Sequence, residues 1–330
     1  MKFGSVAIKD SVGGILAHSM LGIGGYISKG TVLDATHIAQ LCAAGHENLV
    51  VARLEKGDVE ENLAATRLAK AIVCKPEMQG LRVARAGAGR VNLYSTRAGI
   101  VLLDEAAILA VNTVNPMITI ATVSRFKRVE VGSMIATIKI ISYSVSEVAL
   151  EDACSVGLSG LSIAAPIFET ATLVETQVEE KRGTGKGQVA ITGRLDRLGV
   201  QLESKIVVEH KKDQLADALK EAKGDVVFIL TASATSDPLD VGPEALRKAG
   251  GVITAYGMPV DPGNLLFLGW LGKKPVIGLP GCARSPALNG ADWVLERIIC
   301  GQRLTQAHIS SMGVGGLLKE IPTRPMPRAL

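Results

Sequence analysis

Three apolar runs of the sequence each end in polar or glycine-rich residues that can hold a ligand. The runs are LVET at 173–176, VVFILT at 226–231 and PVIGLP at 275–280. If they are parallel strands, their carboxyl ends meet at the edge where open α/β sheets bind ligands. After the third run, Gly281 allows close backbone approach, and Arg284 and Ser285 can donate to an anion. A helix is predicted over 285–301, and the dipole at its start favours negative charge. Local chemistry alone leaves two interpretations open, an ordinary corner and an anion-binding turn.

The loop 231–240, TASATSDPLD, combines small side chains with two carboxylates. Its hydroxyl-bearing candidates for ligand contact are Thr231, Ser233, Thr235 and Ser236. Asp237 and Asp240 come just before a predicted helix. Two interpretations of Asp240 remain: it caps that helix, or its carboxylate binds Mg²⁺ or a polar heterocycle.

Other segments carry weaker signals. The loop KRGTGKGQ at 181–188 is not a Walker A motif, because Lys181 and Gly187 stand where that motif has Gly and Ser or Thr. We therefore expect a solvated loop there. The segment GMPVDPGN at 257–264 contains Asp-Pro-Gly, which is typical of a corner between strands. Cys282 is expected to be an inert small residue, with a soft metal ligand as the alternative.

Composition narrows the class of protein. Of 330 residues, 47% are apolar and only 3% aromatic, which favours an α/β core of branched aliphatic side chains. So few aromatic residues argue against binding of single-stranded nucleic acid, and a net charge of +4 is too small for duplex binding. Five scattered cysteines without a CxxC pair indicate a reducing compartment. Without an apolar leader or a long apolar run, we expect a cytoplasmic protein that does not enter membranes.

The order of predicted elements divides the chain. From about residue 166, strand-like and helix-like segments alternate, which predicts a mostly parallel sheet in a three-layer α/β/α arrangement. The expected domains are a small N-terminal α/β domain (1–72), a β-rich middle domain (73–165), the C-terminal α/β domain (166–304) and a C-terminal arm or linker (305–330).

Several motifs resemble one family. The segments YGMPVDPGNLLFLG at 256–269 and PVIGLPGCARS at 275–285 have the order and separation of two motifs of the molybdopterin-binding domain. The segment LDVGPEAL at 239–246 is similar to the adenylyltransferase form of that domain, with Asp240 at its acidic position. SKGTVLDATHIAQLCAAGHENLVVARLEKGDVEEN, from residue 28, resembles the small domain of molybdopterin molybdotransferases. The chain is especially similar to the bacterial module that precedes a cytidylyltransferase domain.

The resemblance implies a protein of molybdenum cofactor biosynthesis that binds molybdopterin or its nucleotide adduct. Its expected ligand-binding residues are Thr231, Ser233, Thr235, Ser236, Pro262, Gly263, Gly281, Arg284 and Ser285. Asp240 and Asp237 are the candidates for catalysis, and Asp240 is the candidate ligand of Mg²⁺. If the protein is an enzyme, it transfers molybdenum from molybdate or a nucleotidyl group.

Two alternatives to a transferase remain. Where relatives have paired glycines, this chain has Ser233 and Ala234, which favours a non-catalytic carrier that acts with a separate cytidylyltransferase or a molybdoenzyme. The same fold also serves a family of nucleotide pyrophosphatases. The resemblance further implies a homodimer.

Overall fold

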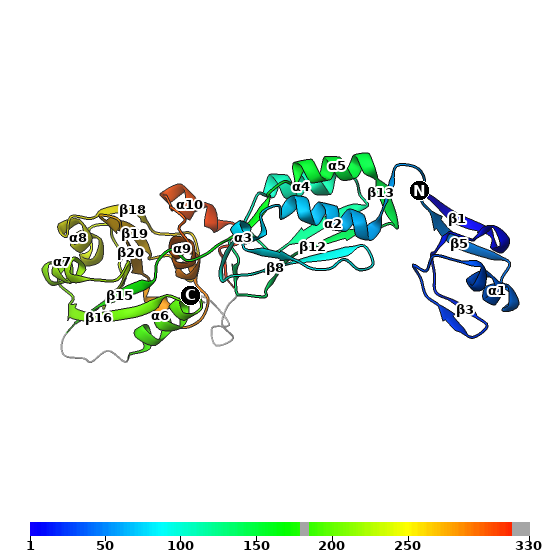
Figure 1. The fold of residues 1–330 in the computed structure, drawn as a ribbon. Coiled ribbons are helices and arrows are strands. Elements are labelled where there is room, and N and C mark those ends of the chain that lie inside the picture. Colours follow the sequence, from blue (N-terminus) through cyan, green and yellow to red (C-terminus); the bar gives the residue numbers. More distant parts are fainter. Residues whose placement is uncertain (179–184, 319–330) are drawn as a thin grey trace, which may run out of the picture. The chain divides into compact units, whose positions relative to one another are not determined.

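The computed structural model, drawn in Figure 1, describes residues 1–178 and 185–318. The chain divides into two compact units. The N-terminal unit comprises Met1–Arg97 with Val101–Ile163, and the C-terminal unit comprises Ala98–Ile100 with the chain from Ala164 onward. None of the described helices is long and apolar enough to cross a membrane. The boundaries expected at residues 72 and 165 stay predictions.

The N-terminal unit begins with a small α/β part built around a buried aliphatic cluster. Its elements are β1 (Lys2–Ala7), η1 (Ile8–Asp10), β2 (Ile15–Leu16), β3 (Met20–Gly22), β4 (Gly25–Ile27), α1 (Ala35–Ala43) and β5 (Asn48–Arg53). β1, β5 and β2 form an antiparallel sheet, and β3 pairs with β4. Asp34 caps α1, and Leu41 of that helix is fully buried in one cluster with Leu49 and Leu16.

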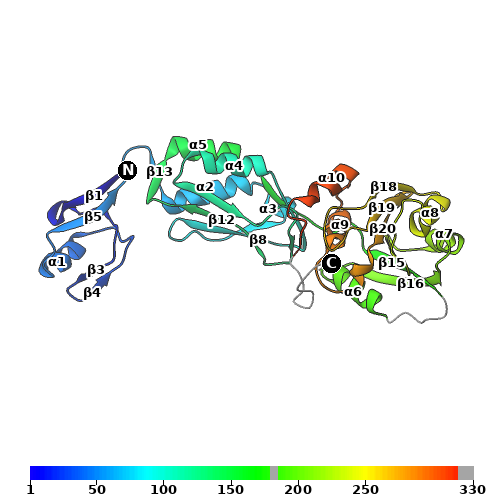
Figure 2. The ribbon, with the colours of Figure 1, turned by 180° about the vertical axis from the view of Figure 1, so that it is seen from behind.

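The rest of this unit combines a four-stranded sheet, which helices cover on one face, with a three-stranded sheet and a pair of strands (Figure 2). Its elements are β6 (Asp58–Glu60), α2 (Glu61–Ile72), α3 (Pro76–Gln79), β7 (Leu81–Val83), β8 (Arg90–Ser95), β9 (Gly99–Leu103), α4 (Glu105–Val114), β10 (Ile118–Thr122), β11 (Arg128–Val129), β12 (Met134–Ile140), β13 (Ser144–Ser146), α5 (Glu147–Val156) and β14 (Leu161–Ala164). Leu68 of α2 and Leu150 of α5 belong to the same buried cluster as Leu93 of β8 and Ile138 of β12. α5, which begins after its N-cap Ser146, was not expected from the sequence.

The C-terminal unit confirms the predicted mostly parallel α/β fold. Its elements are β15 (Thr170–Gln177), α6 (Lys186–Asp196), β16 (Gln201–Glu209), α7 (Lys212–Glu221), β17 (Val226–Leu230), α8 (Val241–Lys248), β18 (Val252–Tyr256), β19 (Phe267–Leu271), β20 (Lys274–Leu279), η2 (Gly281–Arg284), α9 (Gly290–Ile299), α10 (Gln306–Ser310) and η3 (Ser311–Gly313). The strand order is β16–β15–β17–β20–β19–β18. β16, β15, β17 and β20 run parallel, and β19 is antiparallel to both of its neighbours.

Alternate residues of the central strand face two helical layers. Val227 and Ile229 of β17 belong to the cluster formed with α7 and α8. Leu230 faces the other way, toward α6, where its Cδ1 lies against Gly187. α6 and α9 lie on this second face of the sheet (Figure 1). A parallel sheet buried on both faces requires strands that are apolar throughout, as all five residues of β17 are.

The C-terminal segment expected as an arm is partly folded. Residues 306–313 form α10 and η3, and the side chains of Ile309 and Met312 are buried. Residues 319–330 of the expected arm lie outside the described residues.

Candidate functional site

The three strand ends singled out from the sequence lie at one edge of the sheet. β17 lies between β15 and β20, and all three run parallel. Leu230 is in register with Glu175 on one side and with Leu279 on the other. The loops that follow these residues therefore begin side by side, as the sequence predicts.

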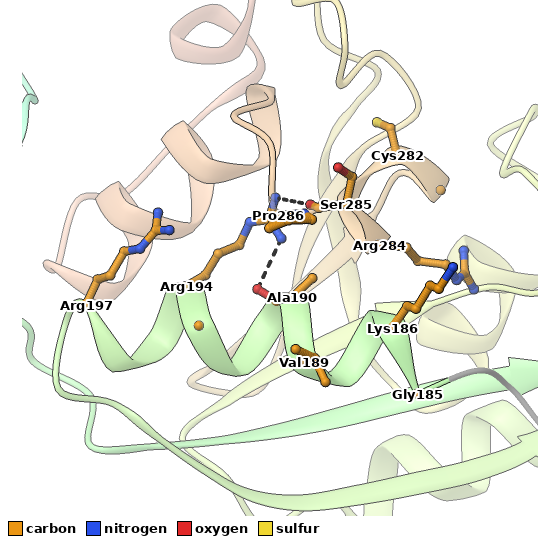
Figure 3. A pocket seen from close by; sticks show the side chains of 12 residues that line it. Gly185, Lys186, Val189, Ala190, Arg194, Arg197, Cys282, Arg284, Ser285 and Pro286 are labelled. Atoms are coloured by element: carbon orange, nitrogen blue, oxygen red, sulfur yellow. Dashed lines mark hydrogen bonds between the residues drawn. The ribbon is translucent and has the colours of Figure 1, made fainter. Parts of the chain in front are cut away.

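A cavity of about 730 Å³ opens at this edge, between α6 and the turn that follows β20 (Figure 3). It is lined by Gly185, Lys186, Val189, Ala190, Gly193, Arg194, Arg197, Gly281, Cys282, Arg284, Ser285 and Pro286. The expected residues Gly281, Arg284 and Ser285 thus line a cavity. The loop 231–240 and the pair Pro262 and Gly263 are not among its lining residues.

The lining of the cavity is basic. Lys186 and Arg284 lie at one end and Arg197 at the other, with Arg194 between them (Figure 3). No carboxylate is among the described lining residues, although Arg194 is paired with the buried Asp292. A concave surface whose charges have one sign attracts ligands of the opposite sign. The cavity is therefore suited to an anion.

Arg284 ties the three strand ends together. Its Nη2 donates to the carbonyl oxygen of Thr231 at 2.9 Å and lies 3.9 Å from Oε1 of Glu175. Glu175 in turn pairs with Lys205 at 2.7 Å. About a third of the Arg284 side chain remains exposed. Because one guanidinium has five N–H donors, Arg284 can make these contacts and still donate to an anion in the cavity.

The helix start near this turn differs from the expectation. Gly281–Arg284 form a short 3₁₀ helix of their own, and α9 begins only at Gly290. Asn289 caps α9, and the Gly290 N–H donates to the carbonyl oxygen of Pro262 at 2.8 Å. The N-terminus of α9 is thus satisfied within the protein. The expectation that this helix dipole acts at the Gly281–Ser285 turn is wrong, because dipole effects fade beyond the first turn of a helix.

The helix whose N-terminus reaches the cavity is α6, which sequence reasoning did not assign to the site. α6 begins at Lys186, and its N-cap Gly185, with φ of 69°, provides no side-chain cap. The segment 181–188 was expected to be a solvated loop, yet Lys186 and Gly187 are helical and Gly187 is buried. Residues 181–184 of that segment lie outside the described residues. A Gly-Lys-Gly start before an apolar helix pattern was the available signal, and its departure from the Walker A spacing argued against it.

The loop 231–240 is held mainly by its own hydrogen bonds. Thr231 Oγ1 donates to the carbonyl oxygen of Ser233 at 2.6 Å. The buried hydroxyl of Thr235 lies 3.4 Å from Thr231 Oγ1. Ser236 Oγ donates to the carbonyl oxygen of Ala234 at 3.3 Å. The Tyr256 hydroxyl donates to the carbonyl oxygen of Thr235 at 3.0 Å. These contacts shape the loop, and the assignment of its hydroxyls to a ligand stays a prediction.

The two acidic candidates of this loop both accept backbone N–H groups. Asp240 caps α8, accepting from Val241 through Oδ1 at 2.7 Å and from Ser236 through Oδ2 at 3.1 Å. Asp237 Oδ1 accepts from Leu239 at 2.7 Å. Burial raises the pKa of Tyr256, and the charges of Asp237 and Asp240 raise it further. The structure therefore supports the capping interpretation of Asp240, while its roles in catalysis and Mg²⁺ binding stay predictions.

Asp240 offers a direct test of the two interpretations. We expect Asp240→Ala to lower the free energy of unfolding by about 1 kcal/mol, since it removes a helix cap. Asp240→Asn keeps an acceptor at the cap and is expected to stay within about 0.5 kcal/mol of the wild type. Urea titration measures both values. If Asp240→Asn is as stable as the wild type but loses affinity for molybdopterin, the carboxylate belongs to the ligand site.

Pro262 and Gly263 lie against α9. Besides the bond from Gly290 to Pro262, a Cβ on Gly263 would come within 2.8 Å of the Gly290 nitrogen, and φ of Gly263 is 146°. A side chain there would displace the start of α9. In this structure the two residues support the helix, and their predicted contact with a ligand stays untested.

Metal-binding chemistry is sparse in the described part of the chain. No group of three or more His, Cys, Asp or Glu side chains there is arranged to hold a metal ion. Cys282 is exposed at the cavity, whereas burial raises the pKa of the Cys300 thiol to about 12. Cys300 is therefore protonated at neutral pH.

Comparison with known proteins gives limited matches. Residues 5–53 match the model of a domain of unknown function, DUF8806. No curated protein matches the chain.

Several solved structures resemble parts or most of the chain. A CinA protein of unknown function from Thermoplasma acidophilum is 18% identical, with 36% of this chain and 90% of that one covered and a TM-score of 0.30. The molybdopterin biosynthesis protein MoeA from Pyrococcus horikosii is 14% identical. The match covers 91% of this chain and 75% of that one, with a TM-score of 0.31. A molybdopterin biosynthesis protein from Mycobacterium abscessus is 16% identical. The match covers 40% of this chain and 89% of that one, with a TM-score of 0.28. Likenesses at these TM-scores carry no argument about function.

Proposed function

We propose that this protein acts in molybdenum cofactor biosynthesis and binds molybdopterin or its nucleotide adduct at the carboxyl edge of the C-terminal sheet. The observation that carries the proposal is the basic cavity of about 730 Å³ at the turn Gly281–Ser285. That turn belongs to the segment whose sequence resembles the molybdopterin-binding domain. The cavity has the size of a small-molecule site.

The terminal phosphate of the ligand would be bound at the end of the cavity that carries Lys186 and Arg284. Both side chains line the cavity, and the Ser285 hydroxyl adds a neutral donor on the same turn. The first N–H groups of α6 begin there, after a cap residue without a side-chain acceptor. Cations and a helix N-terminus together favour a phosphate.

Binding without catalysis has one observation in its favour. The candidate catalytic carboxylates, Asp240 and Asp237, accept backbone N–H groups and do not line the cavity. Handing the cofactor over to a separate cytidylyltransferase or molybdoenzyme is the second candidate function.

Lys186 provides the test of the site. We expect the wild type to bind molybdopterin in an anaerobic equilibrium titration, and Lys186→Gln to bind about 10-fold more weakly, because one charge-assisted contact is removed. The affinity of the variant for molybdopterin is also expected to depend less on salt concentration, because salt screens charge–charge attraction and the variant has lost one of the attracting charges. Lys248→Gln is the matched control, because Lys248 pairs with Asp213 outside the cavity.

Three outcomes decide among the candidate functions. If the wild type binds neither molybdopterin nor its nucleotide adduct, or if both lysine variants weaken binding equally, the proposal fails. If molybdopterin binds but ATP, CTP and molybdate give no turnover, the carrier function is supported over the transferase. Hydrolysis of nucleotides with Mg²⁺ and no pterin binding would instead identify a pyrophosphatase.

A further inference from the structure

Arg194 of α6 lies in the wall of the cavity, yet its side chain is only 4% exposed. Its Nε donates to Oδ1 of Asp292 at 2.6 Å, and its Nη2 lies 3.5 Å from Oδ2 of the same carboxylate. Asp292 is itself buried. A buried charge pair is tolerated only when further hydrogen bonds satisfy its remaining donors and acceptors.

Those further bonds go to the turn that forms the opposite wall of the cavity. Nη1 of Arg194 donates to the carbonyl oxygen of Ala283 at 2.8 Å. Nη2 donates to the carbonyl oxygens of Ser285 at 2.9 Å and Ala287 at 3.1 Å. A further bond from Nη1 reaches Ala190 within α6 at 3.2 Å. Figure 3 shows the side chain reaching from α6 to the turn.

These contacts engage every nitrogen of the guanidinium. An arginine has five N–H donors in a fixed planar fork, and here they meet four carbonyl oxygens and one carboxylate. The donors of Arg194 are thus used within the protein itself. Arg194 therefore differs in role from Lys186 and Arg284, whose side chains we assign to direct contact with the ligand.

The same contacts reach the start of α9. Oδ2 of Asp292 also accepts the N–H of Asn289 at 2.8 Å, which completes the capping box of that helix. The next residue, Gly290, donates to Pro262 at 2.8 Å. One continuous set of hydrogen bonds therefore joins α6, the turn after β20, the cap of α9 and the loop that carries Pro262.

We propose that Arg194 is the positioning residue of the ligand site: it fixes the turn Gly281–Ala287 against α6, so that Arg284 and Ser285 are held facing the anion. This inference rests on the proposed function. Lysine cannot replace Arg194, because an ammonium group has its three donors on one atom and cannot reach the carbonyl oxygens of residues 283, 285 and 287 together. Pro262 and Gly263 then act on the site indirectly, through the start of α9.

The experiment compares three forms of the full chain: the wild type, Arg194→Lys and the double variant Arg194→Met/Asp292→Asn. We expect about 10-fold weaker binding of molybdopterin in both variants, with the dependence of affinity on salt unchanged, because no cation that contacts the ligand is lost. The double variant leaves no unpaired buried charge, and the side-chain amide introduced by Asp292→Asn still accepts from Asn289. Its thermal midpoint is therefore expected above that of Arg194→Met alone, which would leave the charge of Asp292 buried and unpaired, and binding is compared at a temperature where every form is folded.

Hydrogen exchange of the ligand-free protein supplies a second measurement. We expect the amides of residues 282–285 and of Ala287 to exchange at least 10-fold faster in Arg194→Lys, and those of α7, on the far face of the sheet, to be unchanged. Wild-type affinity in a stable double variant, or unchanged exchange in Arg194→Lys, overturns the inference. If the wild type binds no molybdopterin, the proposed function fails, but the exchange result still decides whether Arg194 holds the turn.

Discussion

Replacing Gly278 with alanine is expected to lower the free energy of unfolding of the C-terminal unit by about 3 kcal/mol. Gly278 of β20 is directly opposite Phe267 of β19, and a Cβ on Gly278 would lie 1.9 Å from Cε1 of that ring. Both residues are buried, and the ring is rigid, so that either the ring or a strand must move. Overpacking of this kind is among the largest effects of a single methyl group.

Urea denaturation of Gly278→Ala and of the control Gly4→Ala tests this expectation. Gly4 lies in strand β1, and a Cβ there would meet no atom within 4 Å. We expect the control to stay within about 0.5 kcal/mol of the wild type. An unchanged midpoint in Gly278→Ala would show that Phe267 does not cover this glycine. Because β20 leads into the turn of the cavity, the variant should also bind molybdopterin more weakly.

Much of the C-terminal fold follows from local patterns. The runs at 226–230 and 275–280 are apolar throughout, as strands that are covered on both faces must be, and helix-length segments separate several of the strands. The antiparallel pairing of β19 with β20 also follows from the short turn at 272–273. In the N-terminal unit, α5 was missed because the β-rich run before it dominated the pattern, although Ser146 and Glu147 form a typical helix start.

The turn of the site was predictable because its chemistry is local. Gly281, Arg284 and Ser285 line the cavity, and they follow a strand whose end was identified from the sequence. The start of α9 was placed too early, although Asn289 and Asp292 have the spacing of a capping box.

The opposite wall of the cavity could not be predicted in the same way. Lys186 and Arg194 are separated from the turn by nearly a hundred residues, and only the packing of α6 on the sheet brings them to it. An arginine that is buried looks the same in a sequence as one that is exposed. Its role becomes visible only with its partners.

Replacing Arg284 with alanine is expected to weaken molybdopterin binding about 30-fold. The variant removes one charge-assisted hydrogen bond to the phosphate, for which we take about 2 kcal/mol. It also removes the bond to Thr231 that joins the ends of β17 and β20. Arg284→Lys restores the charge but not the fork, and is expected to recover part of the affinity. If Arg284→Ala binds as the wild type does, the phosphate does not lie at this end of the cavity.

Glu175→Gln is expected to change the affinity for molybdopterin in the direction opposite to Arg284→Ala. Oε1 of Glu175 lies 3.9 Å from Nη2 of Arg284, and the side chain is only 12% exposed, so its negative charge acts against an anion in the cavity. We expect the neutral variant to bind molybdopterin about 5-fold more tightly, from about 1 kcal/mol of removed repulsion. Isothermal titration of both variants against the wild type measures the pair. A ligand held by shape alone would show neither change, whereas opposite changes show that the charge at the turn selects the anion.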